Sequence, residues 1–151
     1  GGEPDAVLRK RHTEALPACF RILERLEVEA YRNQDWCKNI VYKRGKFSRN
    51  KEVTCNLFRG TPMPFDSQAE KDFDAVAKVI RTTGVPLMYI TGSEYAPKGA
   101  LKRVEFHLDG GPNRYSYVYS IGYTNLPPDD PGERRYTAIN RDWYYVWEDW
   151  N

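Results

Sequence analysis

Few residues of this chain have the types and the spacing that catalysis or metal binding requires. His12 and His107 are its only histidines, and its cysteines, Cys19, Cys37 and Cys55, form no Cys-x-x-Cys pair. A zinc site would therefore have to collect its ligands from distant elements. No phosphate-binding glycine loop, nucleophile elbow, His-Glu-x-x-His helix or calcium loop occurs. We therefore expect no metal site, no cofactor and no catalytic residue, and predict that the protein is not an enzyme.

The candidates for acid–base chemistry are one histidine and a cluster of carboxylates. His107 falls on the polar side of a predicted strand, which favours a solvated histidine over a catalytic base. Asp129, Asp130 and Glu133 lie in the loop TNLPPDDPGE, whose three prolines exclude regular structure. Nothing obvious in the sequence would remove them from water, and burial is what raises the pKa of a carboxylate toward neutrality. We predict an exposed acidic loop that speeds docking to a basic partner.

Cations concentrate in residues 43–51, KRGKFSRNK, the most basic segment of the chain. Cations hold phosphates and aromatic rings stack on bases, so this segment is the best argument for nucleic-acid binding. A solvated turn is the interpretation that we favour, because the neighbouring elements are acidic and no motif of the RRM kind occurs. The residues of the nucleic-acid alternative are Lys43, Arg44, Lys46, Phe47, Arg49 and Lys51.

The length and composition of the chain are those of one globular domain. Its 151 residues can bury a core without metals or disulfides, and 40% of them are apolar against 29% charged. No apolar run approaches the roughly 20 residues that a membrane span needs. The net charge of +2 is too balanced to indicate a nucleic-acid protein by itself. We predict a single domain over residues 1–151, in which residues 1–4 are a cloning remnant or disordered.

The first predicted helix covers residues 5–26, where apolar residues recur on one stripe. Pro17 interrupts this pattern. Either the helix kinks at the proline, or Thr13 caps a shorter helix that has Pro17 in its first turn.

The second predicted helix covers residues 67–83 and is the clearer of the two. Ser67 and Glu70 have the spacing of a capping box, and Gly84 supplies the stop. Its apolar stripe is narrow, which is typical of a helix that packs on one side of a sheet.

Period-two alternation predicts the strands. They are residues 35–42 and 52–58, which form a hairpin around Lys46, and residues 86–91, 101–109, 114–123 and 134–140, the last continued by the extended segment 143–150. The predicted fold class is α+β: a mostly antiparallel sheet of about six strands, in the order α-β-β-α-β-β-β-β, with two helices packed on one face. The later half is expected to form a meander.

Tyrosines occupy every second position of the strand 114–123, which we expect to be central. The four-residue turn 110–113 sets its register against the preceding strand. In that register one continuous apolar face forms, so the rings are predicted to be core and to face the helices. The expected pairs join Val104, Phe106 and Leu108 to Tyr119, Tyr117 and Tyr115.

The state of the cysteines indicates whether the protein works in a reducing or an oxidising compartment. Cys37 and Cys55 would stand opposite each other in the hairpin around Lys46, so a cross-strand disulfide is an open alternative. Two buried thiols are the interpretation that we favour, because nothing else in the sequence suggests secretion. A reducing, cytoplasmic location follows.

The order of the elements resembles that of the YezG-like immunity proteins, small bacterial antidotes to secreted polymorphic toxins. The likeness is carried by the helix 67–83, the strands 101–109 and 114–123, and Glu133-Arg134-Arg135-Tyr136 leading to Asp142-Trp143-Tyr144-Tyr145. This chain departs from the family in being slightly basic. The resemblance implies no catalysis, a cytoplasmic location, and function by plugging the active site of one toxin.

We therefore predict a non-catalytic protein-binding module, most concretely an immunity protein that binds a toxin. We expect a monomer or a weak homodimer and no membrane partner. The alternatives are a nucleic-acid-binding domain that uses residues 43–51, and a small enzyme with a site built from loops. Rings supply the desolvated centre of an interface and acidic loops steer docking. The expected partner-binding residues are Tyr123, Asp129, Asp130, Glu133, Trp147 and Trp150.

Overall fold

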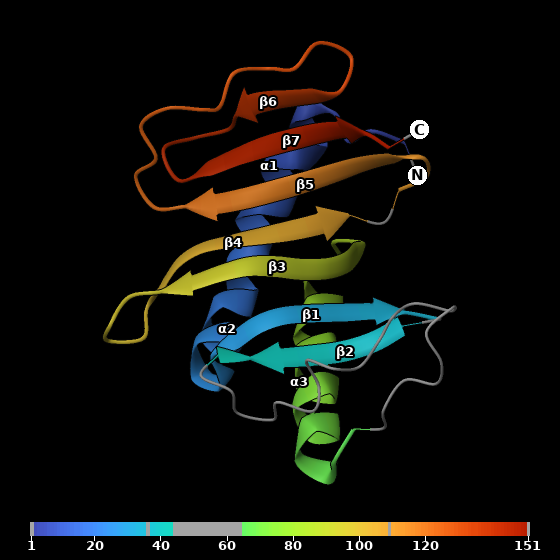
Figure 1. Ribbon diagram of the computed structural model, residues 1–151, viewed down its shortest axis with the longest axis vertical. Helices are drawn as coiled ribbons and strands as arrows, with labels where there is room; N and C mark the ends of the chain where they lie inside the picture. Colours follow the sequence, from blue (N-terminus) through green and yellow to red (C-terminus); the bar gives the residue numbers. More distant parts are fainter. Residues whose placement is uncertain (1, 36, 44–64, 109, 151) are drawn as a thin grey trace.

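The computed structural model describes residues 2–35, 37–43, 65–108 and 110–150 as a layer of helices on one face of an antiparallel sheet (Figure 1). The helical segments are α1 (Ala6–Ala15), the 3-10 turn η1 (Leu16–Cys19), α2 (Phe20–Leu26) and α3 (Ser67–Thr83). The strands are β1 (Val28–Gln34), β2 (Cys37–Tyr42), β3 (Leu87–Tyr95), β4 (Leu101–Leu108), β5 (Asn113–Ser120), β6 (Arg134–Ala138) and β7 (Trp143–Asp149). The predicted α+β class is confirmed, and the described residues contain seven strands where about six were predicted for the chain.

All neighbouring strands of the sheet are antiparallel, in the order β2-β1-β3-β4-β5-β7-β6. The expected meander holds for β3, β4 and β5. It fails after β5, because β7 lies between β5 and β6. The loop of residues 121–133 must therefore run back along the sheet before β6 begins.

The first predicted helix is interrupted at its proline. Asp5 caps α1, accepting a hydrogen bond of 2.8 Å from the backbone nitrogen of Leu8. Pro17 then lies in the first turn of η1, and the helical path resumes as α2. Thr13 is not a cap, because its hydroxyl donates to the carbonyl of Arg9 inside α1. The alternative in which Thr13 caps a shorter helix is therefore wrong, and the helical path instead continues past Pro17 through a 3-10 turn.

The bounds predicted for the second helix are confirmed as those of α3. Its cap is Asp66, whose carboxylate accepts a 2.8 Å bond from the backbone nitrogen of Ala69. The expectation that Ser67 caps the helix is therefore wrong by one residue. Gly84 ends α3 at a φ of 69°, a left-handed conformation that glycine adopts without steric cost.

The described residues contain a hairpin, β1–β2, that the sequence did not predict. β2 pairs with β1, a strand that we did not predict, and the turn between them follows Gln34. The cause is the end of α2, where Glu27 adopts a left-handed φ of 52° and turns the chain directly into β1. A glycine would have signalled this stop, whereas a glutamate does not. The predicted strand 52–58 lies outside the described residues.

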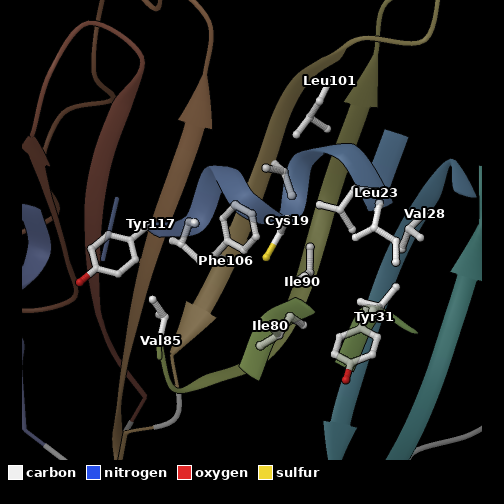
Figure 2. Close-up of a cluster of buried hydrophobic side chains, with 14 of the residues drawn as sticks. Cys19, Leu23, Val28, Tyr31, Ile80, Val85, Ile90, Leu101, Phe106 and Tyr117 are labelled. Carbon is white, nitrogen blue, oxygen red and sulfur yellow. The ribbon is translucent and has the colours of Figure 1, made fainter. Parts of the chain in front are cut away.

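The core lies between the helices and the face of the sheet that they cover, and it includes the tyrosine strand (Figure 2). The predicted register is confirmed where Phe106 pairs with Tyr117 and Val104 with Tyr119. The ring of Tyr117 is buried and its hydroxyl lies 2.7 Å from Nδ1 of His12 on α1. The rings of β5 therefore face the helices, as expected.

Two further expectations are corrected by contacts. Cys37 is disulfide-bonded, so the preferred interpretation of free thiols is wrong for this residue. Cys55, its partner in the alternative that we left open, lies outside the described residues. Cys19 is free and buried, and burial raises the pKa of its thiol to about 12.

At the start of the chain Pro4 is buried, and Glu3 accepts a bond from the hydroxyl of Tyr145. These two residues are packed on the domain, in a segment expected to be a remnant or disordered. Among the described helices, none is long and apolar enough to span a membrane.

Candidate functional site

The face of the sheet that the helices leave uncovered, which we call the open face, gathers the polar and aromatic side chains that do not enter the core. Residues directly opposite one another on neighbouring strands point to the same side of a sheet. Pairing through His107 therefore defines one row that crosses all seven strands. The row runs Asn39, Arg32, Tyr89, His107, Ser116, Val146 and Tyr136.

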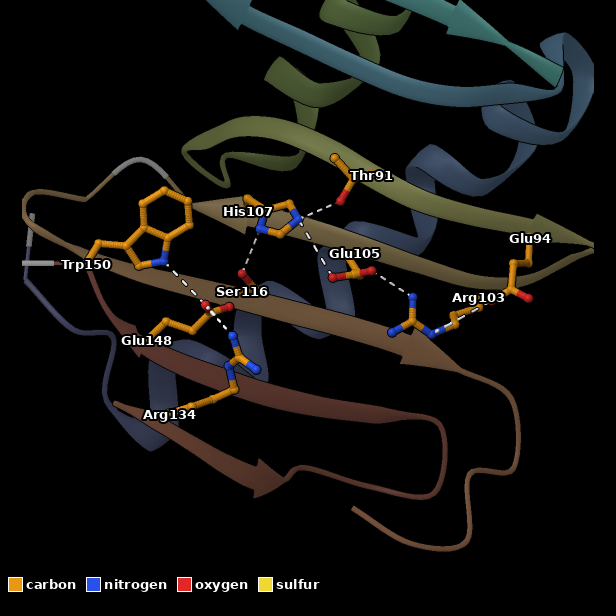
Figure 3. A network of polar contacts seen from close by, with 9 residues as sticks. All are labelled: Thr91, Glu94, Arg103, Glu105, His107, Ser116, Arg134, Glu148 and Trp150. Carbon is orange, nitrogen blue, oxygen red and sulfur yellow. Dashed lines mark hydrogen bonds and ion pairs between the residues drawn. The ribbon is translucent and has the colours of Figure 1, made fainter. Parts of the chain in front are cut away.

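His107 is enclosed at the middle of the open face (Figure 3). Its Nδ1 lies 2.8 Å from the hydroxyl of Ser116, and its Nε2 lies 2.8 Å from the hydroxyl of Thr91. The ring stacks on Tyr89 at a centroid distance of 4.2 Å, with only 12% of the side chain exposed. The expectation of a solvated histidine is therefore wrong, although His107 does lie on the polar side of its strand.

Burial lowers the pKa of His107 to about 4, so the ring is neutral at pH 7. A neutral ring donates through one nitrogen and accepts at the other, which satisfies both hydroxyls. Ser116 is only 3% exposed, and the nearest carboxylate oxygen of Glu105 is 4.0 Å from Nε2. An activated serine needs an accessible hydroxyl and a base oriented by a third group. The arrangement is that of a satisfied buried histidine.

A groove of about 270 Å³ lies beside this histidine, between the sheet and the loop 121–133. Its floor is apolar at Val118 and Val146, and Pro127 of the loop forms a wall. Its remaining lining residues are polar, aromatic or charged: Arg103, Glu105, Ser116, Arg134, Tyr136, Tyr144 and Glu148.

Ion pairs line the groove on both sides. Nη1 of Arg103 lies 2.8 Å from Oε2 of Glu105, and Nη2 of Arg134 lies 3.0 Å from Oε2 of Glu148 (Figure 3). The Arg103–Glu105 pair sits over Gly92, which has a φ of 64° in the irregular part of β3. A Cβ at that position would collide with the carboxylate of Glu105. The glycine therefore makes room for the pair.

The loop 121–133 packs on the open face and is not a free tip. The Tyr123 hydroxyl donates to the carbonyls of Asn140 (2.7 Å) and Trp143 (3.2 Å), and its ring meets that of Tyr144 edge-on. Leu126 packs on the cluster of Val118, Tyr144 and Val146. Tyr123, an expected partner-binding residue, thus holds the loop in position.

The acidic residues of this loop are exposed, as expected, and lie along the outer edge of β6. The carboxylate of Asp129 accepts a 3.0 Å bond from the backbone nitrogen of Tyr136. Asp130 exchanges two backbone bonds with Arg134, of 2.8 and 2.9 Å. Glu133 has a pKa raised by a hydrogen bond with Asp130 and by that residue's charge. Asp129 and Asp130 therefore cover the edge strand.

The two expected tryptophans lie on different faces. Trp147 packs on the core side of β7, with the guanidinium of Arg135 5.3 Å from the centroid of its ring. Trp150 is 59% exposed, and its Nε1 donates to Glu148 at 3.3 Å, which keeps it beside the open face. The six expected partner-binding residues therefore do not form one patch.

Of the nucleic-acid alternative, only Lys43 is described. Its Nζ lies 5.2 Å from the centroid of the Tyr95 ring. Arg44, Lys46, Phe47, Arg49 and Lys51 lie outside the described residues.

A larger hollow of about 390 Å³ lies between α1 and the end of β6 and includes Arg9, Lys10 and Asn140 in its lining. Arg9 donates to the carbonyl of Pro4 at 2.8 Å and lies over the ring of Tyr145. Because Arg9 is already bound within the protein, we regard the groove on the open face as the better candidate for a binding site. Within the described ranges, no group of three or more His, Cys, Asp or Glu side chains could hold a metal ion.

The sequence did not point to Arg32, Arg103, Arg114, Ser116 and Tyr144 as site residues, although all five lie on the open face. The alternation that assigned the apolar side of 101–109 and 114–123 to the core also assigned their other side to one common surface. The composition of that surface was therefore available, whereas the loop that covers part of it was not. Comparison of the chain with family profiles, with curated proteins and with solved structures found no match in any of the three.

Proposed function

We propose that this protein is a non-catalytic binding module that docks on a partner protein through the open face of its sheet. The observation that carries the proposal is the groove of about 270 Å³ on that face, with an apolar floor and ion pairs along its rim. A desolvated pocket surrounded by paired charges accepts an anchoring side chain of a partner. Trp150 is exposed beside the groove, so its ring can insert into a pocket of the partner protein.

The most concrete form of the proposal is an immunity protein that binds a bacterial toxin. It rests on the resemblance to YezG-like immunity proteins and on the enclosed state of His107 and Ser116, which favours binding over catalysis. The acidic loop residues Asp129 and Asp130 would steer docking, since exposed charges act mainly on the association rate.

A cytoplasmic location belongs to the same proposal, because it follows from the resemblance. The disulfide at Cys37 argues for an oxidising compartment, since cytoplasmic thiols are kept reduced. Alkylation of thiols in freshly lysed source cells distinguishes the two. A reactive Cys37 supports the cytoplasm, and a protected Cys37 contradicts it.

The test of the function is calorimetric titration with the product of the adjacent gene. We expect a dissociation constant of about 1 μM or tighter, and we expect Trp150→Ala to weaken binding at least tenfold. Val7→Ala is the matched control, because Val7 is 80% exposed on α1, in the helical layer. No binding would remove the toxin from the proposal, and a loss caused by Val7→Ala alone would contradict docking through the open face.

A further inference from the structure

Among the residues that the structure describes, four arginines lie on the open face, and they divide into two kinds. Arg103 and Arg134 each have a carboxylate within 3.0 Å, at Glu105 and Glu148. Arg32 and Arg114 instead lie on aromatic rings: the guanidinium carbon of Arg32 is 4.1 Å from the centroid of Tyr89, and that of Arg114 is 4.7 Å from the centroid of Trp150. A ring holds a guanidinium in place by cation–π attraction and leaves its edge able to bind a ligand.

Neither Arg32 nor Arg114 has a carboxylate at ion-pair distance within the part of the chain that the structure describes. Nη1 of Arg32 donates to Oε1 of Gln34 at 2.6 Å, which supplies no charge. Glu148 pairs with Arg114 across the strands, but its carboxylate turns to Arg134 and to the indole of Trp150. The carboxylate on the strand opposite Arg114 is therefore already bonded to other residues.

Arg114 also has an incomplete set of hydrogen bonds. Its Nε is shielded from solvent and has no hydrogen-bond partner. A buried donor without an acceptor costs free energy, and a charged one costs more. The described residues therefore leave the guanidinium of Arg114 incompletely satisfied.

The charges of Arg32 and Arg114 change the pKa values of neighbouring groups. Burial lowers the pKa of Arg32, and the charge of Arg114 lowers it further. Both arginines also lower the pKa of His107, which lies between their strands, against the opposing effect of Glu105 and Glu148. Arg32 and Arg114 therefore both act electrostatically on this side of the open face, where neither guanidinium is paired with a carboxylate of the described residues.

We propose that Arg32 and Arg114 bind two carboxylates of an acidic segment of the partner protein. This inference rests on the proposed function, because it takes the open face as the docking surface. Three strand spacings, about 14 Å, separate the backbones of β1 and β5, so each guanidinium receives its own carboxylate. The planar guanidinium fork matches a carboxylate through two parallel hydrogen bonds.

The neighbouring carboxylates favour an acidic peptide over a nucleic acid as the occupant. Glu94, Glu105 and Glu148 are interspersed among the arginines on this face. A phosphate backbone, charged at every nucleotide, would pass close to them and be repelled. Two separate carboxylates can meet the arginines and avoid the glutamates.

The experiment titrates ¹⁵N-labelled protein at low salt with an end-blocked serine peptide that carries two glutamates four positions apart, about 14 Å in an extended chain, and follows the arginine Nε–H resonances. We expect the signals of Arg32 and Arg114 to shift, and expect Arg32→Gln and Arg114→Gln each to weaken binding about tenfold. Arg81→Gln, an equal loss of charge in the last turn of α3, should change the affinity less than twofold. Circular dichroism of each variant shows whether the fold is retained.

The outcomes separate the two proposals. If the partner protein binds and Trp150→Ala weakens it while both Arg→Gln variants leave it unchanged, the carboxylate site is wrong and the proposed function stands. If the peptide binds at Arg32 and Arg114 while no partner protein docks, the site stands and the proposed function fails. Tighter binding of a ten-nucleotide oligothymidine than of the peptide would overturn the choice of an acidic segment.

Discussion

At the scale of single residues, the open face shows that a position on a polar side of a strand does not mean contact with water. His107 is held by two hydroxyls from neighbouring strands and by a stacked tyrosine. Its environment disfavours the charged ring, because burial outweighs the attraction of Glu105 and Glu148. His107 therefore makes the folded protein less stable as the pH falls.

We predict that acid destabilises the protein through His107. The folded pKa is about 4 and the ordinary value is 6.5, so between these values the unfolded chain binds a proton that the folded chain does not. The contribution of His107 is fully present above pH 6.5 and is lost as the pH falls toward 4. Over that window the free energy of unfolding should drop by up to about 3 kcal/mol.

Urea unfolding at pH 7 and pH 4.5 measures this loss. The variant His107→Gln should show a smaller decrease, because carboxylates and His12 titrate in both proteins and cancel in the comparison. An equal decrease in the variant would mean that His107 is not the group responsible.

At the scale of elements, the loop 121–133 explains how β6 ends the sheet without exposing its edge. An edge strand presents unpaired backbone groups that can pair with another chain. Asp129 accepts the backbone nitrogen of Tyr136, and Asp130 bonds to the backbone of Arg134. Two residues expected to bind a partner therefore have a structural role at this edge.

We predict that Asp129→Ala uncovers the edge of β6. The backbone nitrogen of Tyr136 loses its acceptor, which should cost about 1 kcal/mol and open a site for strand pairing between molecules. Light scattering after gel filtration should show self-association that grows with protein concentration.

Glu133→Ala is the control for this edge. It removes an equal charge from the same loop without removing an acceptor from β6, so we expect it to behave as the unsubstituted protein does. Equal self-association of the two variants would point to lost charge, not to the uncovered edge.

At the scale of the whole molecule, the helices on one face make the two sides of each strand unequal. On β4, Phe106 is completely buried and stacks with Phe20 and Trp143, whereas Glu105 lies on the open face with 30% of its side chain exposed. Of two adjacent residues on one strand, one therefore contributes to the stability of the core and the other to the open face.

We predict that Phe106→Ala lowers the free energy of unfolding by about 3–5 kcal/mol, because it leaves a cavity among packed rings. Glu105→Ala should cost less than about 1 kcal/mol, since partly exposed ion pairs contribute little. Chemical denaturation of both variants measures the difference. Similar losses would contradict the assignment of one face to the core and the other to recognition.

What the sequence determined by itself was everything that depends on local periodicity. The alternation of 101–109 and 114–123 predicted their strands, their register and the side that faces the helices, since a strand has only two sides. The apolar stripe and the glycine stop likewise predicted the bounds of α3.

Tertiary structure alone decided what depends on contacts between distant segments. β1 begins where Glu27 takes a left-handed turn that its residue type does not signal, and β7 enters between β5 and β6, which no local pattern indicates. The candidate site follows from the second of these. Because β7 separates β5 from β6, the loop 121–133 has to return past β7, and its packing on the open face places Pro127 at the groove.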